Sequence, residues 1–169
     1  KSRVAVYMTG RPTPTHPPQG RVGPFLGLKR PVQLCVAKGE STWVVVADAA
    51  DSTIKRYHFT GGEPRLSFQH RRDIYTEADT GLVSVLVWKE ISGLAADDEL
   101  NVYITDAVRD TVSRYDRNGR FVRVVSTAGS GDGYCISARG ISWNGSELLV
   151  GDTGQNRVVL LDPDGTETA

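Results

Sequence analysis

The stretch Val-Tyr-Ile-Thr-Asp at residues 102–106 is the part of the chain that decides the fold, because two looser copies of it occur elsewhere. The copies end at Asp48 and Asp152, as the first ends at Asp106. Nine residues after each aspartate stands an apolar residue, and thirteen after each stands a glycine. A repeat near ~40–50 residues is typical of a β-propeller, whose blades cannot bury their faces alone.

Each copy has the pattern of several short strands rather than of helices. In the second copy the apolar runs are rich in Val, Ile, Tyr and Phe, residue types that suit a pleated sheet. These runs predict strands over residues 91–95, 100–105, 111–115 and 121–125. Asn118-Gly119 between the last two is a strong hairpin signal, since both residues tolerate a positive φ. No stretch keeps a helical period over ten or more residues, so the sequence predicts an all-β fold.

The third copy resembles a known repeat family. Gly-Ile-Ser-Trp-Asn-Gly at 140–145, Thr-Gly-Gln-Asn-Arg-Val at 153–158 and Asp-Pro-Asp-Gly at 162–165 are similar to an NHL repeat of six-bladed propellers. The glycine-rich segment 129–133 resembles the crossing between consecutive NHL blades. The resemblance covers about residues 30–169 and implies an NHL-type propeller. It implies little about activity, because the family includes binding scaffolds, RNA binders, receptor domains and a few enzymes.

The expected organisation is a single propeller segment of about three four-stranded blades, a partial or half ring. Blades are predicted at 30–70, 91–126 and 127–169, the last with its glycine-rich linker, and an insertion with a further strand at 71–90. Residues 1–10 are expected to form a strand that closes the last blade, and 11–29 a proline-rich loop. Propellers close with about four to eight blades, so either two chains complete one ring or this chain is a fragment of a longer one.

The composition argues only against partners that are attracted by a strong net charge. The 169 residues include 20 basic and 20 acidic side chains, so no net charge draws the chain to nucleic acid or to a membrane surface. No apolar run approaches the ~20 residues that span a bilayer, and no signal-peptide pattern is visible. The compartment stays open, with the cytoplasm slightly favoured. Cys35 and Cys135 lie in non-adjacent copies and are expected to be buried free thiols.

The repeated aspartates invite a metal or catalytic interpretation, but a structural role is favoured. An aspartate that closes a strand accepts hydrogen bonds from the amides of the following turn, so Asp48, Asp106 and Asp152 are predicted to fix turns. Asn156 is predicted to do the same locally. None of the three histidines falls on a predicted innermost strand, so we expect no catalytic residue, metal or cofactor from this segment. A hydrolase or lyase whose central metal is completed by other blades remains an alternative.

The sequence favours a non-catalytic scaffold that binds a protein partner or a ligand through loops at one end of the ring. The alternative is an RNA-binding propeller that uses an arginine-rich face, since five arginines crowd the second blade. Charge on outer strands also serves as a solvated guard of a sheet edge. The residues predicted to contact a partner are His16, Arg71, Arg72, Arg109 and Arg117.

Overall fold

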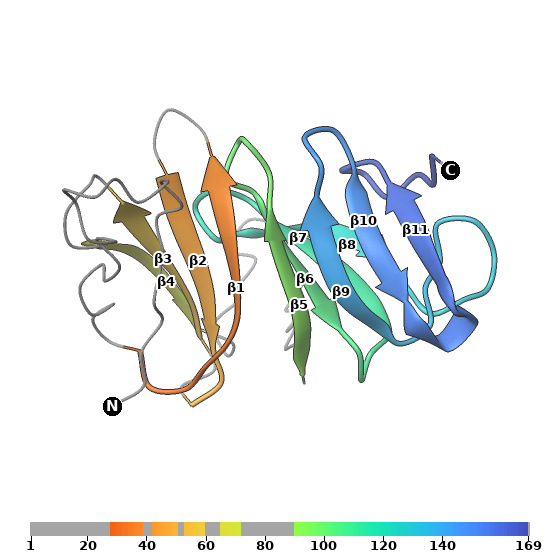
Figure 1. The fold of residues 1–169 in the computed structure, drawn as a ribbon, viewed down its shortest axis with the longest axis horizontal. Coiled ribbons are helices and arrows are strands. Elements are labelled where there is room, and N and C mark those ends of the chain that lie inside the picture. Colours follow the sequence, from red (N-terminus) through yellow and green to blue (C-terminus); the bar gives the residue numbers. More distant parts are fainter. Residues whose placement is uncertain (1–27, 39–41, 51–52, 60–64, 72–89, 169) are drawn as a thin grey trace, which may run out of the picture.

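A computed structural model describes residues 28–38, 42–50, 53–59, 65–71 and 90–168, and these fold almost entirely as β-structure (Figure 1). They form three antiparallel sheets that stand side by side, and each sheet runs through its strands in sequence order. The first strands of the sheets are neighbours, with β5 between β1 and β9. The all-β prediction is therefore confirmed. Among the described residues, no helix has the length and apolarity to cross a membrane.

The first sheet contains β1 (Pro31–Lys38), β2 (Thr42–Asp48), β3 (Thr53–Phe59) and β4 (Arg65–Arg71). The second contains β5 (Ile91–Ala96), β6 (Val102–Asp106), β7 (Thr111–Tyr115) and β8 (Phe121–Ser126). The third contains β9 (Ala138–Trp143), β10 (Leu148–Asp152) and β11 (Arg157–Leu161), with the 3-10 turn η1 (Thr153–Gln155) before β11. Beyond β11, a single bridge pairs Leu161 with Glu167 at this sheet's outer edge.

Two sequence-based boundaries differ from the structure. The second strand of the middle sheet starts at Val102 rather than at residue 100, because Leu100 takes a left-handed backbone conformation (φ 69°) inside a turn. The first blade, predicted to end at residue 70, extends to Arg71, where β4 ends. The expected N-terminal strand, the proline-rich loop and the strand expected within 71–90 lie outside the described residues.

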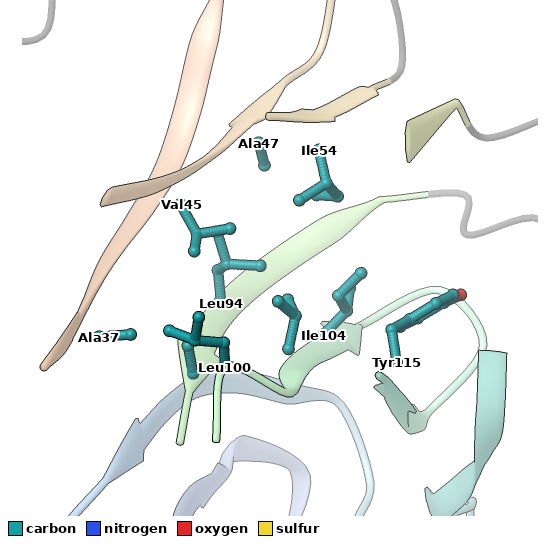
Figure 2. Close-up of a cluster of buried hydrophobic side chains, with 10 residues drawn as sticks. Ala37, Val45, Ala47, Ile54, Leu94, Leu100, Ile104 and Tyr115 are labelled. Carbon is teal, nitrogen blue, oxygen red and sulfur yellow. The ribbon is translucent and has the colours of Figure 1, made fainter. Parts of the chain in front are cut away.

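A buried apolar layer joins the first sheet to the second. Val45, Ala47 and Ile54 of β2 and β3 face Leu94 and Ile104 of β5 and β6 (Figure 2). These side chains alternate along their strands with residues that point to the opposite face, as a pleated strand requires. The layer holds the two sheets face to face.

A second apolar layer joins the middle sheet to the third. It uses the other face of the middle sheet, where Tyr103 and Val112 are fully buried, and meets Leu148, Val150 and Val159 of the third sheet. The middle sheet is therefore covered on both faces. This double burial explains the nearly continuous apolar sequence of β6.

The inner strands β5 and β9 approach each other closely at Gly93. The hydroxyl of Thr105 donates to the carbonyl oxygen of Arg139 (2.8 Å), and that of Ser92 donates to the carbonyl oxygen of Ala138 (2.7 Å). A Cβ on Gly93 would clash with the same Arg139 carbonyl and stand 2.7 Å from Thr105 Oγ1. The absence of a side chain at Gly93 is what lets the two inner strands meet.

Replacement of Gly93 by alanine is expected to destabilise the fold by about 1–3 kcal/mol, because the added methyl group overpacks a contact made by backbone. Gly140→Ala is the matched control, since a Cβ at Gly140 meets nothing within 4 Å. Urea unfolding at neutral pH measures both variants. Equal stabilities for the two variants would contradict this account of the β5–β9 contact.

Candidate functional site

A hollow of about 540 Å³ lies where the three inner strands run into their turns. Its walls come from β1, β5 and β9, with parts of the β5–β6 and β9–β10 turns. The apolar part of the lining includes Leu34, Val36, Leu94, Ile141 and Trp143. The polar part is contributed by Asp98, Ser142 and Asn144. Three segments far apart in sequence therefore share one surface.

The β5–β6 turn beside the hollow is fixed by the buried carboxylate of Asp97. Its Oδ1 accepts hydrogen bonds from the amides of Glu99 (3.0 Å) and Asn101 (2.8 Å), and its Oδ2 accepts from the Tyr103 hydroxyl (3.0 Å). Burial first, and then the Asp97 charge, raise the pKa of Tyr103 well above its ordinary value, so this hydroxyl remains a donor at neutral pH. The turn thus holds Asp98 at the rim of the hollow.

The β9–β10 turn is fixed in a similar way by Asn144. Its Oδ1 accepts from the amides of Ser146 (2.9 Å) and Glu147 (2.8 Å), while Gly145 supplies the positive φ of 111° that the turn requires. Next to it, the Trp143 ring stacks parallel to Tyr103 with centroids 6.4 Å apart. Its Nε1 is buried and makes no hydrogen bond within the described structure.

The three repeated aspartates lie at the opposite ends of the second strands, away from the hollow. Asp48 accepts from the amides of Lys29 (2.6 Å) and Arg30 (2.8 Å), which precede β1, and from that of Ala50 (3.2 Å) in the turn after β2. The Asp48 carboxylate also forms an ion pair with the buried ammonium group of Lys55, at 2.9 Å. One carboxylate therefore ties the entry of the sheet to its second strand and its third.

Asp106 and Asp152 repeat the link back to the segment before the first strand, and of the two Asp106 alone also accepts amides of the following turn. Asp106 accepts from the amide of Glu90 before β5 (3.3 Å) and from that of Val108 in the following turn (3.0 Å). Asp152 accepts from the amide of Ile136 before β9 (2.7 Å) and from Arg157 Nε (3.0 Å). The link back to the segment before each first strand was not visible in the sequence, which indicated only the following turn.

Asn156 has a different local geometry. It ends η1 in the left-handed conformation (φ 53°), and its amide donates to the carbonyl oxygen of Thr153 (3.4 Å). Asparagine is among the residues that adopt this conformation most readily. The left-handed conformation of Asn156 directs the backbone from η1 into β11.

The predicted partner-contact residues do not gather at one place. Arg109 follows β6 and Arg117 follows β7, so they stand at opposite ends of the middle sheet. Arg117 is exposed on the same end as the hollow, and its carbonyl oxygen accepts from Arg56 Nη1 (2.7 Å). Arg71 ends β4. His16 and Arg72 lie outside the described residues.

Two other arginines of the middle sheet are engaged within the structure. Arg114 and Arg123 both lie near the Asp164 carboxylate, at 3.3 Å and 3.5 Å. The Arg114 guanidinium also stacks over the Tyr103 ring, with its carbon 5.9 Å from the ring centroid. Part of the arginine-rich face therefore bridges the second and third sheets.

The remaining chemistry of the described residues is sparse. Within the described ranges, no three His, Cys, Asp or Glu side chains come together as ligands for one metal ion. Cys35 and Cys135 are free thiols, as predicted, although Cys35 is only half-buried and lines the hollow. Desolvation raises the pKa of Cys35 to about 12, which keeps the thiol protonated and a poor nucleophile at neutral pH.

Solved propeller structures are similar to this chain. A virginiamycin B lyase from Staphylococcus aureus aligns with a TM-score of 0.52 at 15% identity, over 82% of this chain and 40% of that chain. A chain of a nidogen/laminin complex gives 0.53 at 17% identity, over 85% of this chain and 48% of that chain. The described residues form three consecutive blades of a β-propeller.

A third similar structure is the β-propeller domain of Cps50 (Swd1) from Myceliophteria thermophila. Its TM-score is 0.51 at 14% identity, over 77% of this chain and 39% of that chain. The chain thus spans less than half the length of the structures it matches. No protein-family model and no curated protein matches the sequence. At these identities the likeness shows the propeller fold alone.

Replacement of Asp48 by asparagine is expected to lower the free energy of unfolding by about 3–5 kcal/mol at neutral pH, because it leaves the buried Lys55 ammonium without its carboxylate. Urea unfolding measures the loss. Asp132→Asn, an exposed site in the glycine-rich linker, is the control and is expected to change little. A stability of Asp48→Asn equal to that of the control would refute the role assigned to this carboxylate.

The same carboxylate gives the blade an acid-sensitive stability. Burial alone would raise the pKa of Asp48, but hydrogen bonds from Lys29, Lys55 and Arg30 outweigh it and lower the pKa below its ordinary value. A depressed folded-state pKa stabilises the fold above the ordinary carboxyl pKa, and this contribution is lost as pH falls through the lowered value. Urea midpoints of the wild-type chain are thus expected to fall below about pH 4, with a weaker decline in Asp48→Asn. Identical pH profiles of the wild-type chain and Asp48→Asn would contradict the lowered pKa of Asp48.

Proposed function

We propose that this chain is part of a non-catalytic, NHL-type propeller that acts as a rigid scaffold for a protein partner. The observation that carries the proposal is the hollow at the turn end of β1, β5 and β9. Its apolar floor and its polar rim of Asp98, Ser142 and Asn144 have the composition of a small protein-interaction site. The NHL assignment rests on the sequence resemblance of the third copy.

Rigidity of the surrounding turns favours binding at this place. Asp97 fixes the backbone of one turn and Asn144 that of the other through several hydrogen bonds each. A turn that is already ordered loses little conformational entropy when a partner binds. The hollow therefore presents its polar groups in one geometry to any partner.

Protein is favoured over RNA as the partner for two reasons. Arg114 and Arg123 share the Asp164 carboxylate, which reduces the positive charge available to phosphates. The hollow itself has an aspartate and no basic residue among its lining. The nidogen/laminin structure among the similar propellers is, by its name, a complex between proteins.

The test is affinity capture from a nuclease-treated cell extract, comparing the wild-type chain with Ser142→Arg. Ser142 is exposed on β9, so the long arginine side chain fills the hollow without disturbing a buried layer. A partner held by the wild-type chain is expected to be lost from Ser142→Arg, at least about tenfold in recovered amount. Thr127→Arg, which adds the same charge at an exposed site between β8 and β9, is the control and is expected to retain the partner.

Three results would contradict the scaffold proposal. Equal capture by Ser142→Arg and the wild-type chain would show that the hollow does not bind the partner. Binding that disappears with nuclease treatment and falls steeply with salt would instead support the RNA alternative. Turnover that depends on an added divalent metal would support the enzyme alternative.

A further inference from the structure

The β9–β10 turn contains an asparagine followed by a glycine, a pair in which the backbone can attack the asparagine side chain. The backbone nitrogen after an asparagine can bond to the side-chain carbon Cγ and close a five-membered ring, because the chain already holds these two atoms close together. Glycine favours this reaction, since it has no Cβ to obstruct the approach. Asn144-Gly145 and Asn118-Gly119 are both such pairs, and both asparagines are exposed. The structure distinguishes them by the hydrogen bonds of the attacking nitrogen and of the attacked carbonyl group.

The attacking nitrogen of the Asn118-Gly119 pair is held in the folded chain. The Gly119 amide donates to the carbonyl oxygen of Asp116 (2.8 Å), and Gly119 is buried. Attack on Asn118 therefore requires this hydrogen bond to open first, which costs a free energy of local unfolding. The fold protects Asn118 in this way.

The attacking nitrogen of the Asn144-Gly145 pair is accessible. Within the part of the chain that the structure describes, the Gly145 amide donates no hydrogen bond, and Gly145 is exposed. A Cβ added at Gly145 would meet nothing within 4 Å. Water therefore reaches this amide, and water is what must take its proton before the nitrogen can attack.

The side-chain carbonyl group of Asn144 is also polarised for attack. Its Oδ1 accepts from the amides of Ser146 (2.9 Å) and Glu147 (2.8 Å) and from the Ser146 hydroxyl (3.1 Å). Attack on Cγ places negative charge on Oδ1, and donors that already point at this oxygen stabilise that charge. Among the described residues, no donor reaches Oδ1 of Asn118, whose only hydrogen bond is made by its backbone amide.

We propose that Asn144 is a deamidation site built into the fold, and that its conversion places a carboxylate at the rim of the hollow. The Gly145 nitrogen loses its proton to water and bonds to Cγ of Asn144, the Cγ–Nδ2 bond breaks, and ammonia leaves with a proton from water. A second water molecule opens the resulting succinimide at either of its carbonyl groups, which gives aspartate or isoaspartate. The reaction consumes one water and releases one ammonia, and it needs no oxidant and no cofactor.

The product alters the turn and the hollow beside it. Nδ2 of Asn144 donates to Oε2 of Glu147 (3.3 Å), whereas a carboxylate in its place repels that side chain. In the isoaspartate product an additional methylene enters the backbone and displaces Oδ1 from the amides that it accepts. Asn144 and Gly145 line the hollow together with Asp98, so the rim of the hollow gains negative charge. This inference does not rest on the proposed function, because the reaction is measured without a partner.

The experiment is peptide mapping by mass spectrometry after prolonged incubation of the chain at neutral pH, with Asn118 as the internal reference. In the folded chain, conversion at Asn144 is expected to be at least about tenfold faster than at Asn118, because only the latter requires local opening. In guanidinium chloride the two asparagines are expected to convert at similar rates, since both precede glycine. This second arm separates the effect of the fold from the effect of the sequence.

Replacement of Ser146 by alanine tests the polarised carbonyl group. It removes the hydroxyl donor and keeps both amide donors, so the folded-state rate at Asn144 is expected to fall about two- to tenfold, the worth of one hydrogen bond. The rate at Asn118 and the rates in guanidinium chloride are expected to stay unchanged. Ser130→Ala, at an exposed position of the glycine-rich linker, is the matched control and is expected to keep the wild-type rates.

Three results would overturn the proposal. The first is conversion of Asn118 in the folded chain at a rate equal to or above that of Asn144. The second is a difference between the two asparagines that persists in guanidinium chloride, because the fold would then not be its cause. The third is a folded-state rate of Ser146→Ala equal to that of Ser130→Ala.

Discussion

The hydrogen bonds accepted by Asp48, Asp106 and Asp152 are the constraint on which the rest of the structure depends. Each carboxylate ends a second strand and receives amides from the segment that enters the same sheet, such as Lys29 or Ile136. This fixes where the first strand begins relative to the second. Since the first strands β1, β5 and β9 are also the ones that meet between blades, the same carboxylates set how the blades align. A charged hydrogen bond to a buried carboxylate is stronger than a neutral one, which suits this role.

The segments that enter the sheets are fixed at one end of the strands, and the turns that line the hollow lie at the other end. The turns after β5 and β9 carry Asp97 and Asn144, which satisfy their own backbones and leave Asp98 and Ser142 facing the hollow. The repeated aspartates thus lie at one end of the strands, and the polar side chains that line the hollow lie at the other. The apolar layers between blades connect the two ends and prevent one blade from sliding past another.

Sequence alone predicted the blades because the information for them is local. Alternating Val, Ile and Tyr residues gave the strands of the middle sheet, apart from Leu100, whose left-handed turn depends on the buried Asp97–Asn101 pair. The hollow was not predicted, since Leu34, Leu94 and Trp143 come together only through the packing of three inner strands. The hydrogen bonds from the segment before each first strand to the aspartate were not predicted for the same reason, because the donating amides lie 16 to 19 residues earlier in the chain. No local pattern records that distance.

Amide hydrogen exchange at Ile136 tests the central claim most directly. Ile136 is an exposed residue outside any strand, and its amide bonds only to the Asp152 carboxylate, at 2.7 Å. Gly131, exposed in the same linker, provides the reference. We predict that the Ile136 amide exchanges as slowly as the amides of β10, far more slowly than that of Gly131. Exchange at Ile136 as fast as at Gly131 would contradict the claim that the repeated aspartates hold the entries of the blades.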